Sequence, residues 1–194
     1  MTNPLIRQSA MEYFKELVEG AVEHQHVESE ELTRFYVVNL LAGFVQLDDS
    51  KTALDDEPLA LRLGRALQSG GASQRAGLRQ VGDASLFVSG FFSDSLKRKL
   101  VDLDYYIAVG GYAYEELSRQ ESLRVSRIFA ELAEKFTAFV DVLNEVSERS
   151  GISSNHDLLR LYEKWIRTGS RRDGDLLVER GIVPNASITQ RFLQ

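Results

Sequence analysis

The sequence has no cysteine, and only three prolines, three histidines and one tryptophan among 194 residues. Without cysteine the chain can form no disulfide, no thiolate metal site and no cysteine nucleophile. This composition is typical of proteins in a reducing compartment, so we expect a cytoplasmic location. The scarcity of proline also leaves helices few forced stops.

Long hydrophobic runs are absent as well. A span across a bilayer needs about 18 uninterrupted apolar residues, and no run in the chain approaches that length. The first residues also lack the basic segment and apolar core of a signal peptide. Because 43% of the residues are hydrophobic, the chain can bury one substantial core. We expect a single helical domain over residues 1–194, with 182–194 as an extended tail.

Positive charge is scarce in the first third of the chain. The net charge is −6, and residues 1–57 hold 4 Lys and Arg against 12 Asp and Glu, which leaves 19 against 17 for the remainder. Phosphate binding needs a dense basic face, so we expect no nucleic-acid partner. Basic residues do gather at positions 160–172, where they form either a solvated face or a surface for an acidic partner.

Helical periodicity is what the sequence has in abundance, and no pair of alternating runs predicts a hairpin. We therefore predict an all-α fold, a single-domain bundle of seven or eight helices, with the second, fourth, fifth and sixth in the buried centre. Ser29 and Ser122 are candidate N-caps of the second and sixth helices. The expected helices cover roughly residues 3–24, 29–45, 57–68, 73–93, 102–119, 122–151, 155–169 and 171–180.

Small residues line the two central helices. Gly82, Ser85 and Ser89 recur three or four positions apart, and Gly110-Gly111 interrupts the next apolar run. One interpretation is tight packing between the two helices, with serine hydroxyls bonded to carbonyls one turn earlier. The other is a pocket between 79–93 and 102–118, with charge from an Arg-Asp pair four residues apart and walls from tyrosines. The candidate ligand-binding residues are Arg79, Asp83, Ser89, Asp104, Tyr105, Tyr106 and Tyr112, with Tyr114 as a further wall.

Asp83 falls inside an apolar segment, and a buried carboxylate needs a partner. Arg79, one turn earlier on the same face, is the nearest candidate by spacing. Asp104 stands where a helix should begin, so capping and the helix dipole explain it without catalysis. One Glu23-x-x-His26 match falls short of the two such motifs of a di-iron bundle. We predict no catalytic residue, no metal ligand and no cofactor.

Two resemblances arise from the central segment. Residues 78–92, together with 101–106 and Gly110-Gly111, resemble a family of small all-α bacterial proteins that has no assigned activity, which implies a fold and no function. Residues 79–85, Arg-Gln-Val-Gly-Asp-Ala-Ser, are similar to the first part of the distal-helix motif of haem oxygenases, Arg-x-x-Gly-Asp-x-Ser-Gly-Gly. Leu86-Phe87 stands in place of the glycine pair, and no histidine lies early in the first helix, where those enzymes carry the proximal ligand.

The leading hypothesis is a non-catalytic helical protein that acts through protein-protein interaction or regulation, with a homodimer as one form of it. It follows from wide apolar arcs on several helices combined with an absence of reactive groups. The alternative is a small-molecule-binding protein or enzyme with a haem-oxygenase-like helical fold and a pocket between 79–93 and 102–118.

Overall fold

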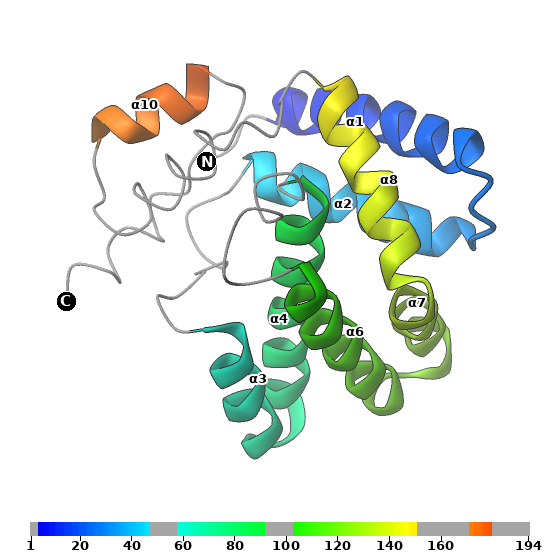
Figure 1. Cartoon of the computed structure of the whole chain (residues 1–194), viewed down its shortest axis with the longest axis vertical. Coiled ribbons are helices and arrows are strands. Elements are labelled where there is room, and N and C mark those ends of the chain that lie inside the picture. Colours follow the sequence, from blue (N-terminus) through cyan, green and yellow to red (C-terminus); the bar gives the residue numbers. More distant parts are fainter. Residues whose placement is uncertain (1–3, 47–57, 92–102, 151–170, 180–194) are drawn as a thin grey trace.

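The computed structural model describes residues 4–46, 58–91, 103–150 and 171–179 (Figure 1). In these ranges the chain forms eight α-helices and no strand, which confirms the all-α prediction. Seven of them, α1 to α8, pack into a compact bundle, and none of the described helices is long and apolar enough to cross a membrane. The helices are α1 (Pro4–His24), α2 (Glu31–Gln46), α3 (Leu59–Gln68), α4 (Gly71–Phe91), α6 (Leu103–Gln120), α7 (Leu123–Glu134), α8 (Phe136–Arg149) and α10 (Arg171–Glu179).

Helix α4 lies at the centre of the bundle. It packs against α6, α8, α3 and α2, and every residue from Ala84 to Phe91 is buried. Helices α1 and α2 pack against each other, and α1 also contacts α8 (Figure 1). Of the two helices of the small-residue prediction, α4 is in the interior, whereas α6 buries one face and exposes the other, which carries Asp104 and Tyr112.

The close approach of α4 to its neighbours depends on glycine. A Cβ added at Gly82 would overlap the ring of Tyr114 on α6, and one added at Gly90 would overlap Leu143 on α8. A Cβ at Gly110 would overlap Ser85 on α4 and the ring of Phe136. Because these three positions have no room for a methyl group, the packing interpretation of the small residues is confirmed for α4 and α6.

Gly111 is the exception among the central glycines. A Cβ at this position would have no neighbour within 4 Å, so no described group packs against it. Ser89 instead follows the prediction: its hydroxyl donates to the carbonyl of Ser85 one turn earlier, at 2.6 Å. Such a bond satisfies a buried hydroxyl inside an apolar helix without any partner from outside it.

The expected sixth helix is two helices. Helix α7 ends at Glu134 and α8 begins at Phe136. Lys135 between them adopts φ −105° and ψ 25°, outside the helical range. An apolar seam in which residues recur at alternating spacings of three and four nevertheless stays buried on both sides of the break: Phe129, Leu132, Phe136, Phe139, Leu143 and Val146. The bend lets α7 pack mainly against α6 while α8 packs against α4 and α1. Tertiary packing therefore overrides a periodicity that would continue straight.

The predicted caps are also partly wrong. Helix α2 begins at Glu31, two residues after Ser29, and no hydrogen bond to the Ser29 hydroxyl is formed. The carboxylate of Glu131 on α7 accepts from the backbone N–H of Glu30 instead, at 3.0 and 3.2 Å. Ser122 does stand at the N-cap position of α7, but its side chain makes no capping bond. The carboxylate that caps α2 thus comes from a distant helix.

Other boundaries agree more closely with expectation. Helix α1 ends at His24, α6 begins one residue after the predicted start, and α10 matches the predicted eighth helix. Helix α3 ends at Gln68 as expected, and α4 begins at Gly71, two residues before the predicted start, with a positive φ of 58° that glycine adopts easily. The predicted helix at 155–169 and the tail at 182–194 lie outside the described residues.

Candidate functional site

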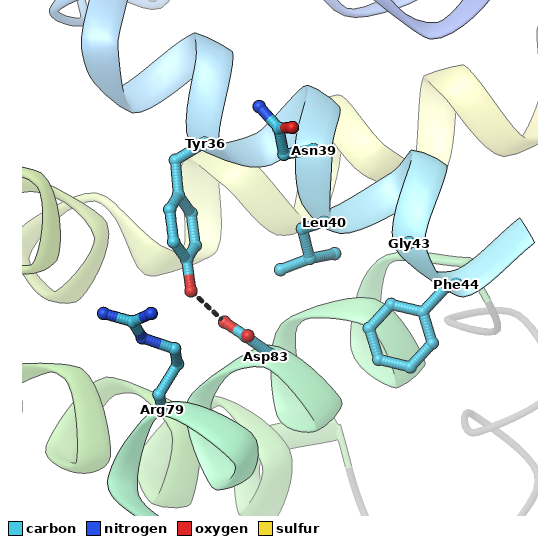
Figure 2. Close-up of a pocket in the computed structure, with 7 residues that line it drawn as sticks. All are labelled: Tyr36, Asn39, Leu40, Gly43, Phe44, Arg79 and Asp83. Atoms are coloured by element: carbon cyan, nitrogen blue, oxygen red, sulfur yellow. Dashed lines mark hydrogen bonds between the residues drawn. The ribbon is translucent and has the colours of Figure 1, made fainter. Parts of the chain in front are cut away.

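Asp83 on α4 is held by tyrosines from two other helices. The hydroxyl of Tyr36 on α2 donates to Oδ1 of Asp83 at 2.6 Å (Figure 2). The hydroxyl of Tyr114 on α6 donates to the same oxygen at 2.7 Å. Three helices therefore meet at one carboxylate oxygen, and both bonds leave Oδ2 to other partners.

Aromatic packing positions the two hydroxyls. The ring of Tyr114 is fully buried against Gly82, next to Asp83 in the chain, and a buried phenol hydroxyl requires a hydrogen-bond partner. Phe129 on α7 lies against both tyrosines, stacked on Tyr114 with ring centroids 5.6 Å apart and edge-on to Tyr36 at 5.2 Å. The small residue before Asp83 thus allows the contact that supplies one of its donors.

Arg79 does not form the expected hydrogen bond with Asp83. Its guanidinium lies over the ring of Phe129, with Cζ 5.2 Å from the centroid, and Nη2 is 3.6 Å from the carboxylate of Glu121. The described hydrogen bonds to Asp83 come from the tyrosines, so the predicted direct pair is wrong. Spacing of four residues placed both groups on one face of the helix, but the half-exposed guanidinium reaches Glu121 beyond the end of α6.

Burial dominates the electrostatics of Asp83. It raises the pKa of this carboxyl to about 6, although the hydroxyls of Tyr36 and Tyr114 and the charge of Arg79 lower it. Burial and the nearby carboxylate also raise the pKa of both tyrosines well above their ordinary value. At neutral pH the tyrosines are therefore protonated donors and the carboxyl is mainly ionised. Asp83 can exchange a proton within about one pH unit of neutrality.

The carboxylate faces an open pocket of about 260 Å³ between α2 and α4 (Figure 2). The residues that α2 contributes recur at helical spacing, so they lie on one face of the helix. They include the polar Asn39, the apolar Leu40 and the small Gly43. Leu40 and Phe44 are buried and give the pocket an apolar side. The lining consists of Tyr36, Asn39, Leu40, Gly43 and Phe44 from α2, and Arg79 and Asp83 from α4.

Five of the sequence candidates lie elsewhere. Ser89 is buried and bonded within α4, while Asp104 and Tyr112 are exposed on α6. The hydroxyl of Tyr105 accepts from the backbone N–H of Ala60 on α3 at 2.9 Å, and its ring meets Tyr106 edge-on at 5.4 Å. The structure therefore brings only Arg79 and Asp83 to the pocket that it describes. That pocket lies between α2 and α4, and not between α4 and α6 as the sequence suggested.

The contribution of α2 escaped sequence reasoning. Tyr36, Asn39, Leu40 and Gly43 are spaced by three, one and three residues, so they share one face of a helix. A tyrosine, an amide and a glycine on a largely apolar helix were a signal comparable to the small residues of α4. Sequence reasoning interpreted the wide apolar arc of this helix only as burial.

Histidines offer no support for a metal or haem site in the described part of the chain. His24 is 70% exposed and its Nδ1 contacts the carboxylate of Glu145 at 3.1 Å. No group of three or more potential metal ligands occurs among the described residues, and no histidine lines the pocket. The described residues at the pocket therefore do not fit a histidine-ligated haem.

Comparisons with family models, with curated proteins and with solved structures found no match. The two resemblances of the central segment, to a bacterial helical family and to haem oxygenases, stay predictions.

Proposed function

We propose that the chain is a binding protein for a small molecule, which it holds in the pocket between α2 and α4. The observation that supports this most is the ionisable carboxylate of Asp83 inside that pocket. An isolated buried charge is costly, and a pKa raised by burial is a common property of binding and catalytic carboxyls. A pocket with one apolar side and a few convergent polar groups is also the usual form of a small-molecule site.

A purely structural role for Asp83 is the main alternative. Asparagine could accept hydrogen bonds from Tyr36 and Tyr114 through its amide oxygen and join the same three helices without a charge. The raised pKa shows that the charge opposes folding at neutral pH, since burial favours the neutral form. A charge that lowers stability where a neutral isostere would serve supports a role beyond holding the helices together.

Native mass spectrometry of the full chain, purified from its host, tests the proposal. We expect a non-covalent adduct in the wild type that is lost on denaturation and depleted in Asp83→Asn. Asp141→Asn is the matched control, because Asp141 is exposed on α8, far along the chain from the pocket helices. Equal adduct occupancy in the wild type, Asp83→Asn and Asp141→Asn would place the ligand elsewhere and contradict the proposal.

Association with a protein partner, or with a second copy, stays a prediction. Several large apolar side chains are exposed, but they come from different helices: Phe35 on α2 is 57% exposed, Leu61 on α3 59% and Leu123 on α7 77%. Single exposed apolar residues are common on monomeric proteins. Light scattering tests the homodimer, which would have twice the mass of the 21.9 kDa chain.

A further inference from the structure

We propose that the pocket between α2 and α4 selects molecules that carry a protonated amine, which donates to Oδ2 of Asp83 while an apolar group lies against Leu40 and Phe44. This inference rests on the proposed function and names the ligand class. Two features of the pocket support it: the carboxylate of Asp83, which bonds no cation among the described residues, and the apolar side that Leu40 and Phe44 form.

The charge of Asp83 has no bonded counter-ion among the described residues. Both of its hydrogen bonds come from neutral phenols, and both reach Oδ1. Phenols stabilise an anion by hydrogen bonding but do not cancel its charge. An ammonium group at Oδ2 would supply the missing positive charge and a short charge-assisted hydrogen bond.

Arg79 also lines the pocket, and its charge lowers the pKa of Asp83, but its guanidinium forms no hydrogen bond with that carboxylate among the described residues. Its guanidinium contacts the carboxylate of Glu121 and lies over the ring of Phe129. The charges of Arg79 and Glu121 cancel, and with Asp83 the three residues together carry one negative charge at neutral pH. That balance favours a cation and disfavours a carboxylate or phosphate.

Apart from Asp83, the polar residues of the wall are Tyr36, Asn39 and Arg79. The Nδ2 group of Asn39 donates one N–H to the carbonyl of Phe35 at 2.8 Å, which leaves its second N–H and its Oδ1 to other partners. An ammonium carries three donors and no acceptor, so the carboxylate of Asp83 offers it a complementary partner. The buried side chains of Leu40 and Phe44 provide the apolar contact. A volume of about 260 Å³ suits a compact amine of metabolite size.

Three probes with one ring and different charge test the inference: benzylamine, benzyl alcohol and benzoate. Binding to the full ¹⁵N-labelled chain is followed through the backbone amide resonances of Asn39 and Gly43. We expect benzylamine to shift both resonances, benzyl alcohol to bind about tenfold more weakly, and benzoate to leave them unchanged. Asp83→Asn should reduce the affinity for benzylamine to that for benzyl alcohol, and Asp141→Asn should not change it.

A pH series on the wild type gives a second measurement that needs no variant. The affinity for benzylamine should fall about tenfold as the pH is lowered from about 7.5 to about 5, since Asp83 takes up its proton there. The groups that face Asp83 are Tyr36, Tyr114 and Arg79, and the pKa values of the two tyrosines are raised well above their ordinary value, out of this range. The affinity for benzyl alcohol should stay constant.

The outcomes separate the inference from the proposed function. If benzoate or benzyl alcohol binds at these resonances as tightly as benzylamine, the pocket binds small molecules but does not select amines, and the inference is overturned. If none of the three probes shifts either resonance, both the inference and the pocket as a binding site are contradicted. Benzylamine binding that persists in Asp83→Asn and at low pH would also overturn the inference.

Discussion

Helix α4 makes two contacts of opposite character. Toward α6 its surface is filled, because Gly82 and Gly110 bring the two helices so close that a methyl group does not fit. Toward α2 the surface stays open, and Asp83 lies beside a pocket. Because one helix takes part in both contacts, the difference arises from its partners. Glycines and small side chains give close packing, whereas the tyrosine, amide and glycine of α2 leave a space with a charge in it.

The pH dependence of stability gives the largest expected contrast between the two contacts. The pKa of Asp83 is raised to about 6 in the folded chain, so the folded chain binds the proton more tightly than the unfolded one. Its contribution to stability is therefore complete below pH 4 and is lost as the pH rises through 6. The free energy of unfolding of the wild type minus that of Asp83→Asn should fall by about 3 kcal/mol between about pH 4 and pH 7.

Urea denaturation at several pH values measures this difference. The carboxyls of Glu131 and Glu145 have lowered pKa values and change the stability in the opposite direction, but they are present in both proteins and cancel. A difference that does not vary with pH would show that Asp83 is not buried as a charge.

Gly110 and Gly111 are adjacent in the chain, but only Gly110 lies in the filled contact between α4 and α6. Gly110→Ala should lower the free energy of unfolding by about 1–3 kcal/mol, because the added methyl meets Ser85 and Phe136. Gly111→Ala should raise it by about 0.5–1 kcal/mol, because the position is helical and has no neighbour. Chemical denaturation of the two variants measures both values, and the same sign for both would argue against the close approach of α4 and α6.

Removal of one tyrosine hydroxyl at a time compares the buried and the open side of Asp83. Tyr114→Phe should destabilise the fold by about 1.5–3 kcal/mol, since a hydrogen bond to a charged group is lost where water has no access. Tyr36→Phe should cost less, about 1 kcal/mol, because water in the pocket can replace its hydroxyl. Thermal denaturation ranks the two, and a larger loss for Tyr36→Phe would reverse the assignment of open and filled sides.

The smallest expected effect concerns the rim of the pocket. Gly43→Ala should stabilise the chain by about 0.5–1 kcal/mol, since Gly43 is helical and a methyl there meets nothing within 4 Å. The same substitution at Gly82 should destabilise it, because the ring of Tyr114 occupies the space. Equal effects at the two positions, measured by urea denaturation, would mean that the α2 and α6 sides of α4 are equally packed.

The sequence allowed most of the fold to be predicted, because helices are local and their apolar periodicity is strong. The small residues of α4 and α6 also indicated close packing, since only contact explains Gly110 inside a helix. The break at Lys135 could not be predicted, because no proline or glycine marks it and the seam continues through it. Likewise Ser29 looked like a cap, whereas Glu131, about a hundred residues later, supplies the bond.

Half of the candidate site was within reach of sequence reasoning. Arg79 and Asp83 were found because a charged pair in an apolar helix is conspicuous. Tyr114 was expected only as a wall of a pocket and Tyr36 was not expected, because the two come from separate helices and their convergence on Asp83 depends on the packing of α2 and α6 around α4. The choice of Glu121 for Arg79 was equally non-local. Residue spacing predicts which side chains are neighbours on one helix. It does not predict whether a side chain will bond such a neighbour or a group from another helix.

The ionisation of Asp83 is the point on which the proposed site depends most directly. Carbon NMR of the full chain, labelled at the side-chain carboxyl of aspartate and assigned by comparison with Asp83→Asn, measures it as the pH is varied. We predict a midpoint at about pH 6, moved to lower pH when benzylamine is present. A midpoint near the usual aspartate value of about 4, unchanged by benzylamine, would contradict the account.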